Sequence, residues 1–410
     1  MCEQMITEKQ TERKTKVFAI CLGQIPSAIV GVVEPLNELK KKNIIEFTFL
    51  ETLKVTKREI AEADVVIFIR SSETYEYTIA KECKRLGKYI IYYLDDDLLN
   101  IPETANSYIY FSNETIQKNI IDIMKLSNCL WTNNINIEKK YKDFFSKSAV
   151  THAPALLLKH LEWAEEIEES DTVKIGFAGG IDHQGFLESF LEEPIQYLIH
   201  KYGSSITFEF MGAKPSFVER LSLVYIPYQD THEKYIKMIQ ERRWDIGLAP
   251  LPESPFHACK YFNKYLEYGA IGCAGVYSDV QPYKQIVVNE YNGLLVDNDK
   301  NAWMKAISNL IENGELRKRI RREARKKLED EFTTINVAES AQRKIDELSR
   351  YKAPVCREGQ VKLQSGKIQF FMERFNTIIK NHGINSPVYI TKKIIIKLCR
   401  RLPWMDSRKG

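Results

Sequence analysis

Short and mostly continuous apolar runs recur through the first half of the chain, separated by stretches of helical character. They stand at residues 17–22, 45–50, 63–71 and 89–94. Continuous rather than alternating hydrophobicity is typical of strands that helices cover on both faces, as in a parallel sheet. The alternation of such strands with amphipathic stretches, for example 74–86, predicts a doubly wound domain. We place it at residues 16–160, after a flexible N-terminus at residues 1–15.

The second half repeats this rhythm from Val173 onward. Strands are expected at residues 173–178, 206–211, 246–249, 275–278 and 293–296, and helices at 186–202, 233–242, 260–268, 302–313 and 316–331. Because strands and helices alternate again, residues 171–350 are expected to form a second domain. The two domains join either near residues 151–154 or in the acidic stretch at 162–171. The expected fold class is therefore α/β, with two doubly wound, Rossmann-like domains.

The pattern changes in the extension at residues 351–410. Residues 351–367 mix Pro, Gly and both charges without a period, which indicates a linker, and two helices are expected after it, at 368–379 and 388–402. The second of these carries an apolar side among many Lys and Arg residues. A basic amphipathic helix of this kind either binds an anionic membrane surface or packs back on the protein. Both interpretations stay open, as does a solvated basic tail.

Composition excludes several classes of protein. The chain has 410 residues, 44% hydrophobic and 28% charged, which suits two folded domains. Its net charge of +4 is too small to predict nucleic-acid binding. No apolar run reaches the ~18 to 20 residues of a membrane span, and the N-terminus lacks the apolar core of a signal peptide. Eight scattered cysteines without a C-x-x-C pair indicate free thiols. We therefore expect a cytoplasmic protein, at the inner face of the membrane if the basic helix binds lipid.

A glycine-rich turn at residues 176–185 follows the first expected strand of the second domain and precedes a helix. Backbone N–H groups at a helix N-terminus bind phosphate, and glycines let the ligand approach them. We expect Gly179 and Gly180 to bind a donor phosphate, although a plain tight turn has the same composition. His183 in this turn either caps the helix or donates a hydrogen bond to a phosphate or a sugar hydroxyl. The second role is favoured, because the turn should face the cleft.

The stretch at residues 244–296 contains the most specific pattern. Small residues follow Glu267, which stands on an expected helix, and the chain then continues through Asp279, Tyr283 and the Asn292–Gly293 turn. This arrangement resembles the retaining GT-B glycosyltransferases of the family 4, or group 1, type. The resemblance is good over residues 173–335 and holds only in outline for the first half. It implies a GT-B fold and a nucleotide-diphosphate sugar, either a UDP-sugar or a GDP-sugar, as the donor.

The resemblance also implies roles for residues. Glu267 corresponds to the acid that hydrogen-bonds the donor ribose. Further donor-binding residues by position are Asp279, Tyr283, Asn292 and Gly293. The first acid of the family pattern is missing, because Cys259 stands eight residues before Glu267. The usual Arg and Lys for the diphosphate are missing as well. We therefore expect Lys260 to stabilise the departing diphosphate; the alternative is a solvated residue at the start of the helix.

An Asp95-Asp96-Asp97 triplet ends one expected strand of the first domain. Some glycosyltransferases bind a divalent metal through an Asp-x-Asp motif, but this triplet lies in the opposite half from the donor features. Open α/β sheets bind ligands at the carboxyl ends of their strands. We therefore expect Asp95 and Asp96 to orient or deprotonate an acceptor hydroxyl, with Asp97, Arg70 and Ser71 on the same acceptor-side wall. Capping of a following helix is the alternative, and no catalytic metal is predicted.

Together these features predict a metal-independent glycosyltransferase of the hexosyltransferase type. By the resemblance, it moves a hexose-type sugar with retention to a hydroxyl on a surface glycan, a lipid-linked intermediate or a protein. The donor site is expected between residues 176 and 293, with catalytic roles for Asp95, Asp96, His183 and Lys260. No cofactor and no nucleic-acid partner are expected. Two other functions stay open: a catalytically silent GT-B-like subunit that activates a partner glycosyltransferase, and a nucleotide-sugar epimerase that needs no acceptor.

Overall fold

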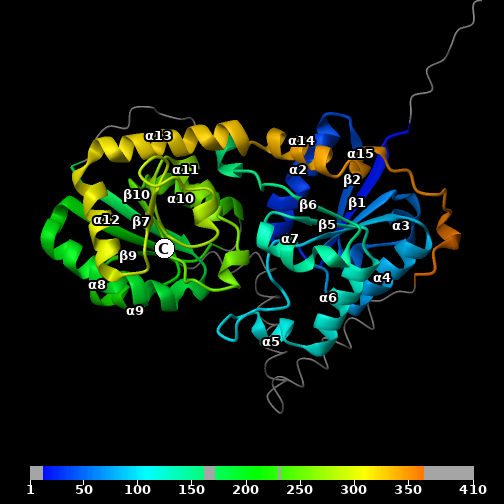
Figure 1. Cartoon of the computed structure of the whole chain (residues 1–410), viewed down its shortest axis with the longest axis horizontal. Coiled ribbons are helices and arrows are strands. Elements are labelled where there is room, and N and C mark those ends of the chain that lie inside the picture. The colour runs from blue at the N-terminus through cyan, green and yellow to red at the C-terminus, as the bar shows by residue number, and fades with distance from the viewer. Residues whose placement is uncertain (1–12, 161–170, 230–231, 364–410) are drawn as a thin grey trace, which may run out of the picture.

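The computed structural model describes residues 13–160, 171–229 and 232–363. Within these ranges the chain forms two six-stranded sheets, both parallel throughout and both flanked by helices (Figure 1). The expected α/β class with two doubly wound domains is therefore confirmed.

The first sheet has the strand order β2-β1-β3-β4-β5-β6. Its strands are β1 (Thr15–Cys21), β2 (Ile45–Glu51), β3 (Val65–Ile69), β4 (Tyr89–Tyr93), β5 (Cys129–Thr132) and β6 (Lys147–Val150). Its helices are α1 (Pro26–Ala28), α2 (Glu34–Lys41), α3 (Lys57–Glu62), α4 (Thr74–Arg85), α5 (Tyr108–Phe111), α6 (Glu114–Leu126) and α7 (Ile135–Tyr141). Val65 and Ile67 of β3 belong to one hydrophobic cluster, while Val66 and Phe68 belong to another. Since both faces of the sheet are buried, the strand carries apolar residues at every position.

The second sheet has the order β12-β11-β10-β7-β8-β9. Its strands are β7 (Val173–Gly179), β8 (Ile206–Gly212), β9 (Val224–Ile226), β10 (Ile246–Ala249), β11 (Ala274–Ser278) and β12 (Leu294–Val296). The helices are α8 (Gln184–Tyr202), α9 (Ser216–Arg220), α10 (His232–Arg242), α11 (Asn263–Ile271), α12 (Lys300–Glu312) and α13 (Gly314–Glu331). A Cβ at Gly247 of β10 would lie 2.6 Å from the ring of Tyr268. The glycine therefore lets α11 pack closely on the sheet, and this contact holds the start of α11 near the carboxyl ends of β7 and β10.

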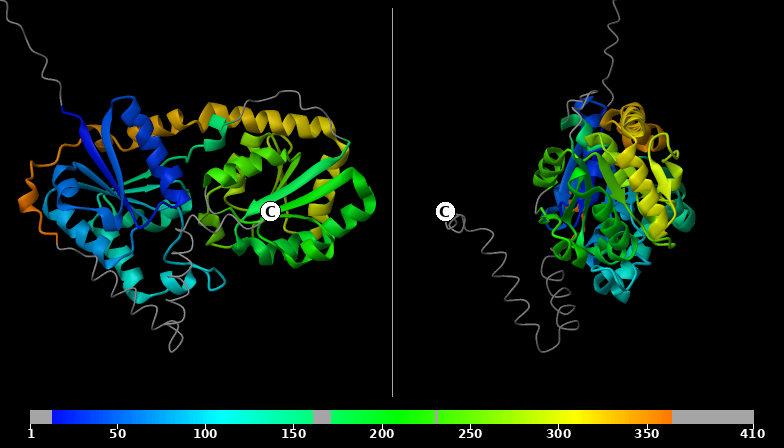
Figure 2. Two further views of the ribbon diagram at one scale, coloured as in Figure 1. Left: turned by 180° about the vertical axis from the view of Figure 1, so that it is seen from behind. Right: turned by 90° about the vertical axis from the view of Figure 1, so that its left-hand side faces the viewer.

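The end of the described chain returns to the first domain. Two further helices, α14 (Thr334–Lys344) and α15 (Glu347–Arg350), place Ala341, Ile345 and Leu348 in the core of the first domain. Figures 1 and 2 show this crossing, with α14 beside α2. We expected residues 171–350 to form one domain, and this expectation is wrong for its last part. The apolar side of α14 packs on the first domain, and the last core residue of the second domain is Phe332.

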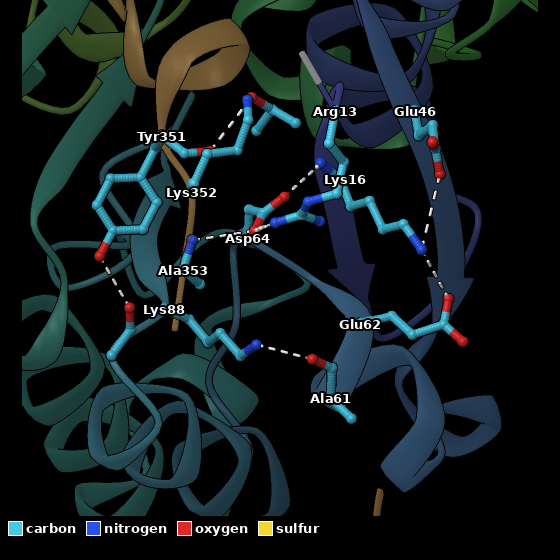
Figure 3. A network of polar contacts seen from close by, with 12 residues as sticks. Arg13, Lys16, Glu46, Ala61, Glu62, Asp64, Lys88, Tyr351, Lys352 and Ala353 are labelled. Atoms are coloured by element: carbon cyan, nitrogen blue, oxygen red, sulfur yellow. Dashed lines mark hydrogen bonds and ion pairs between the residues drawn. The ribbon is translucent and has the colours of Figure 1, made fainter. Parts of the chain in front are cut away.

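Residues 351–363, expected to be part of a linker, contact the first domain. Figure 3 shows Tyr351, Lys352 and Ala353 there, and Val361 and Leu363 belong to its hydrophobic core. The main anchor of this segment is the buried carboxylate of Asp64. It accepts hydrogen bonds from Arg13 Nη2 at 2.7 Å, from the backbone N–H of Lys16 at 2.9 Å and from that of Ala353 at 2.9 Å. The hydroxyl of Tyr351 also donates to the carbonyl of Gly87 at 2.8 Å. These bonds hold residues 351–353 against β1 and the start of β3.

The two helices expected at 368–379 and 388–402 lie outside the described residues. In the part of the chain that is described, no helix has both the length and the apolarity needed to cross a bilayer. The six cysteines in that part, of which five are buried, are all unpaired thiols.

Candidate functional site

An ion pair joins the two domains at the carboxyl ends of their strands. Asp96 follows β4 in the first domain, and Lys260 lies between β10 and α11 in the second. The Nζ atom of Lys260 is 3.1 Å from Oδ2 of Asp96. The structure thus brings together two residues that the sequence assigned to opposite sides of the cleft. Next to this contact, Asn106 of the first domain donates to Asp182 in the glycine turn of the second.

The acceptor-side wall contains buried polar atoms without hydrogen-bond partners. Arg70 has a left-handed backbone, with φ of 50°, and its guanidinium lies 3.5 Å from Asp95 Oδ1 and 3.8 Å from Asp96 Oδ2. The Oδ1 atoms of Asp95 and Asp96 and the hydroxyl of Ser71 are buried and make no hydrogen bond. Buried polar groups in proteins are nearly always paired, so these atoms indicate a place for a ligand or water. Burial alone would lower the pKa of Arg70, but Asp95 and Asp96 outweigh it and raise that pKa.

Asp97 does not belong to this wall. Its carboxylate is fully buried and bound within the first domain by Lys140, by the hydroxyl of Tyr141 and by Asn100 at 2.9 Å. Lys140 and Tyr141 lie in α7, so Asp97 ties the end of β4 to that helix. We expected Asp97 on the acceptor side; the structure gives its carboxylate a role in the fold instead.

The glycine turn of the second domain forms the opposite wall. A Cβ at Gly179 would lie 2.7 Å from the ring of Phe177, whereas a Cβ at Gly180 would meet nothing within 4 Å. Gly179 therefore serves close packing, and open space lies beside Gly180. His183 precedes α8 but makes no side-chain capping bond, so the structure excludes the capping role.

His183 is neutral at physiological pH. Burial, together with the nearby charges of Lys264 and Lys260, lowers its pKa to about 3. Its Nδ1 atom is buried and has no hydrogen-bond partner. A neutral imidazole offers one N–H donor and one acceptor. His183 can therefore hydrogen-bond a phosphate oxygen or a hydroxyl but carries no positive charge to it.

Lys264 is a site residue that the sequence analysis missed. It stands in the first turn of α11, its side chain is only 13% exposed, and its Nζ lies 3.8 Å from Glu267 Oε2. The same Nζ is 5.2 Å from the ring centroid of Phe177, at the end of β7. Burial lowers the pKa of Lys264, while Glu267 opposes that shift. The helix dipole disfavours a cation in a first turn, and nothing in the sequence indicated this position, because the helix was expected to begin at residue 260.

Glu267 has a carboxylate oxygen that accepts no hydrogen bond, as its expected role requires. Its Oε2 is buried without a hydrogen-bond partner. The hydroxyl of Tyr235, from α10, donates to the carboxylate; burial raises the pKa of Tyr235, and the charge of Glu267 and this hydrogen bond raise it further. Tyr235 was not found from the sequence, because nothing in a helix pattern links it to a residue of α11.

The four other expected donor residues are engaged in contacts within the second domain. Asn292 Oδ1 accepts from the backbone N–H of Val288 at 2.7 Å and its Nδ2 donates to Tyr265 Oη at 2.9 Å, so its side chain builds the turn. Gly293 allows close packing, since a Cβ there would lie 2.8 Å from the ring of Tyr277. Tyr283 is buried close enough to Glu267 for that carboxylate to raise its pKa. Asp279 pairs with Lys284 at 3.2 Å.

Cys259 occupies the place of the missing acid, and its side chain is not in the cleft. It is fully buried and belongs to the hydrophobic core of the first domain, although in sequence it lies between β10 and α11 of the second domain. Burial raises the pKa of its thiol to about 11. The residue thus anchors the loop before α11 on the neighbouring domain.

Comparisons with known proteins agree with this architecture. Residues 264–327 match the family model described as glycosyl transferases group 1. HepE of Anabaena, solved in complex with UDP and glucose, is similar with a TM-score of 0.55 at 12% identity, over 82% of this chain and 100% of HepE. An alpha-glucosyltransferase in complex with UDP and DNA has a TM-score of 0.55 at 11% identity, over 81% of this chain and 99% of that one.

A Listeria monocytogenes protein assigned as a UDP-N-acetylglucosamine 2-epimerase has a TM-score of 0.53 at 13% identity, over 83% of this chain and 99% of that one. A search of curated protein sequences finds no match. Identities this low carry the fold and not the activity. The chain has the GT-B fold, and residues 264–327 of its second domain match the model of the glycosyl transferases group 1 family.

Proposed function

We propose that this chain is a glycosyltransferase that moves a sugar from a nucleotide-diphosphate donor to a hydroxyl acceptor. One observation carries the proposal. Two lysines, a neutral histidine and a carboxylate with an oxygen that has no hydrogen-bond partner gather near the end of β7, opposite a pair of aspartates on the other domain. These residues are Lys260, Lys264, His183 and Glu267, facing Asp95 and Asp96.

The second-domain wall suits a nucleotide diphosphate. Lys260 and Lys264 supply two positive charges, as a diphosphate requires, and the space beside Gly180 brings it to the backbone at the start of α8. Neutral His183 adds a hydrogen bond. Oε2 of Glu267, which has no hydrogen-bond partner in the protein, then accepts from a ribose hydroxyl. Positive charge fixed in a partly buried place stabilises the diphosphate most as it departs, when its charge grows.

The first-domain wall suits the acceptor. An acceptor hydroxyl hydrogen-bonded to Asp95 or Asp96 gives its proton to that carboxylate as its oxygen bonds to the anomeric carbon. The bond from that carbon to the diphosphate breaks, and the nucleotide leaves with the electron pair. Attack from the face that the nucleotide leaves retains the configuration. The protein contributes mainly positioning and charge, so no strong nucleophile is needed.

The finer parts of the proposal follow from the sequence. The donor is a UDP- or GDP-linked hexose, transferred without a catalytic metal because the two lysines neutralise the diphosphate. The acceptor belongs to a surface glycan, a lipid-linked intermediate or a protein, in the cytoplasm. The basic segment 388–402, outside the described residues, would bring the enzyme to an anionic membrane surface.

Calorimetry with UDP, GDP and UDP-glucose tests the donor site, and nucleotide release from UDP-glucose tests the chemistry. We expect the wild type to bind a nucleoside diphosphate and Glu267→Ala to bind it much more weakly. A wild type that binds neither nucleotide contradicts the proposal. So does a Glu267→Ala variant that binds as tightly as the wild type.

A catalytically silent subunit remains the second candidate, and the position of Cys259 favours it. Where the family pattern has an acid, this chain has a thiol buried in the other domain. A silent subunit would bind nucleotide and release none from UDP-glucose with any acceptor. An epimerase, in contrast, would convert a nucleotide sugar in the absence of acceptor, which product analysis of the donor alone detects.

A further inference from the structure

Asn134 makes two sets of hydrogen bonds at once. It is 1% exposed and caps α7, where its Oδ1 accepts from the backbone N–H groups of Asn136 at 2.7 Å and Ile137 at 3.3 Å. Its Nδ2 donates across the domain boundary, to the carbonyl of Ala258 at 3.0 Å and to that of Lys260 at 2.8 Å. One amide therefore uses its oxygen for its own helix and its nitrogen for a loop of the other domain.

The same loop has two more attachments to the first domain. Asn136 Nδ2 donates to the carbonyl of Ala258 at 2.9 Å, and Cys259 lies in the first domain's hydrophobic core. Three consecutive residues, Ala258 to Lys260, are thus held by the first domain although they precede α11 of the second. We call residues 257–260 the docked turn.

The docked turn determines where the ammonium of Lys260 lies. The carbonyl of Lys260 is fixed by Asn134, and its side chain runs over the ring of Phe256, with Nζ 4.5 Å from the ring centroid, to reach Asp96 at 3.1 Å. The side chain itself is 37% exposed, so the cleft does not enclose it. Its position therefore depends on the backbone from which it extends.

We propose that Asn134 is a positioning residue for Lys260, and that this lysine reaches the donor phosphate only while the docked turn is held on the first domain. The proposal rests on the proposed function, since it assigns Lys260 to a nucleotide diphosphate. Phosphate binding on the second domain is then coupled to the docking of the first. Holding the turn in advance also removes the entropy that would otherwise be lost when Lys260 is ordered.

Because the oxygen and the nitrogen of the Asn134 side chain have separate partners, a substitution can remove the bonds to the docked turn and keep the cap of α7. Asn134→Ser keeps an oxygen that can cap α7 but loses both donors to the docked turn, and Asn136→Ala removes one bond without touching the cap. Asn113 offers a matched control, because its Oδ1 caps α6 by accepting from Thr115 at 2.9 Å and Ile116 at 3.4 Å. Asn113→Ser therefore makes the same chemical change at a cap within one domain.

The experiment measures the dissociation constant of UDP and hydrogen exchange in the docked turn, on the full chain. We expect Asn134→Ser to weaken UDP binding on the order of tenfold, as loss of a well-placed hydrogen-bond pair does, and Asn136→Ala to weaken it less. Exchange at residues 257–260 should rise in both variants while α7 stays protected. Asn113→Ser should change neither quantity.

A second background separates positioning from general destabilisation. When Lys260→Met is already present, Asn134→Ser should have almost no further effect on UDP binding. We expect this because Asn134 acts on UDP only through the position of the Lys260 ammonium, which the first substitution removes. If Asn134→Ser weakens UDP binding as much in Lys260→Met as in the wild type, the proposal is overturned. It is also overturned if Asn134→Ser and Asn136→Ala bind UDP as tightly as the wild type. Failure of the wild type to bind UDP would instead contradict the proposed function, and the exchange data would still report on the docked turn.

Discussion

Lys260 and Asp96 form an ion pair of 3.1 Å between residues 164 positions apart, one on each side of the domain boundary. Their side chains are 37% and 17% exposed, so water screens the pair and its net contribution to stability is small, at most about 1 kcal/mol. The pair brings the cation that we propose for the donor next to a carboxylate that we propose for the acceptor. Five predictions follow from this arrangement and its surroundings.

Replacement of Glu267 by Gln should weaken UDP binding on the order of 10-fold, because a carboxylate that accepts from ribose hydroxyls is lost. Calorimetry gives the dissociation constant. Glu241→Gln serves as the control, since Glu241 is an exposed acid of α10 whose contact is Lys237 at 3.9 Å. Equal losses in both variants would contradict a ribose role for Glu267.

Lys264→Met should weaken UDP binding on the order of 10-fold or more, because it removes a partly buried charge that faces the phosphates. The pH dependence provides a second measure. Burial lowers the pKa of Lys264, so its charge is lost at a lower pH than that of an exposed lysine. Affinity for UDP should therefore fall as pH rises above neutrality, and Lys264→Arg, which stays charged, should flatten this fall.

His183 should make the fold less stable in acid. Its pKa is about 3 in the folded chain and about 6.5 when unfolded. Below pH 6.5 the unfolded chain therefore binds a proton that the folded chain does not. The contribution of neutral His183 to the free energy of unfolding is complete above pH 6.5 and is lost as pH falls toward 3. Between pH 7 and pH 5 this loss is about 2 kcal/mol.

Urea unfolding at pH 7 and pH 5 checks this prediction. The wild type should lose more free energy of unfolding between the two values than His183→Gln does. His200→Gln, at an exposed site of α8, should behave as the wild type. Equal acid sensitivity of the wild type and His183→Gln would show that another group is responsible.

Two adjacent glycines should respond differently to the same change. Gly179→Ala forces a Cβ to within 2.7 Å of Phe177 and should lower stability by about 1–3 kcal/mol through overpacking. Gly180→Ala meets open space, with a φ of −71° that alanine accepts, and should leave the melting temperature nearly unchanged. Because that space would receive the phosphates, Gly180→Ala should weaken UDP binding. Normal UDP affinity in Gly180→Ala would place the phosphates elsewhere.

Asp95→Asn should separate binding from transfer. The donor contacts that we propose lie on the second domain, so the dissociation constant of UDP should change far less than nucleotide release does. Nucleotide release that depends on an acceptor should fall on the order of 100-fold, the usual contribution of a general base. Asp122→Asn is the control for altered charge on the first domain, because Asp122 is a partly exposed acid of α6 that pairs with Lys118.

The parts of the fold that sequence could predict are those decided within one element. The strand at β3 is apolar at every position because both faces are covered, and that property is visible along the chain. The destination of α14 was not predictable in this way. Its apolar side fits a domain core, but its own residues do not indicate which of the two domains provides the partner surface.

In the candidate site, too, the residues that could be predicted are those placed by their own element, and the missed ones depend on packing between elements. Asp96 and Lys260 could be placed at strand ends and helix starts, so their convergence on one cleft was expected. Lys264 was missed because a lysine in a first turn is ordinarily solvated, and only the packing of Phe177 against it makes it a site residue. Asp97 was assigned to the wall because it adjoins Asp96, whereas the neighbouring α7 turns its carboxylate into the fold.

The return of α14 and α15 to the first domain has a consequence for synthesis on the ribosome. Ala341, Ile345 and Leu348 complete the core beneath β1 and β3, and Asp64 receives its bond from Ala353. The domain that is translated first therefore lacks part of its core until residues 341–348 have been synthesised. The second domain ends its core at Phe332 and can close earlier, which reverses the usual order in which domains fold during translation.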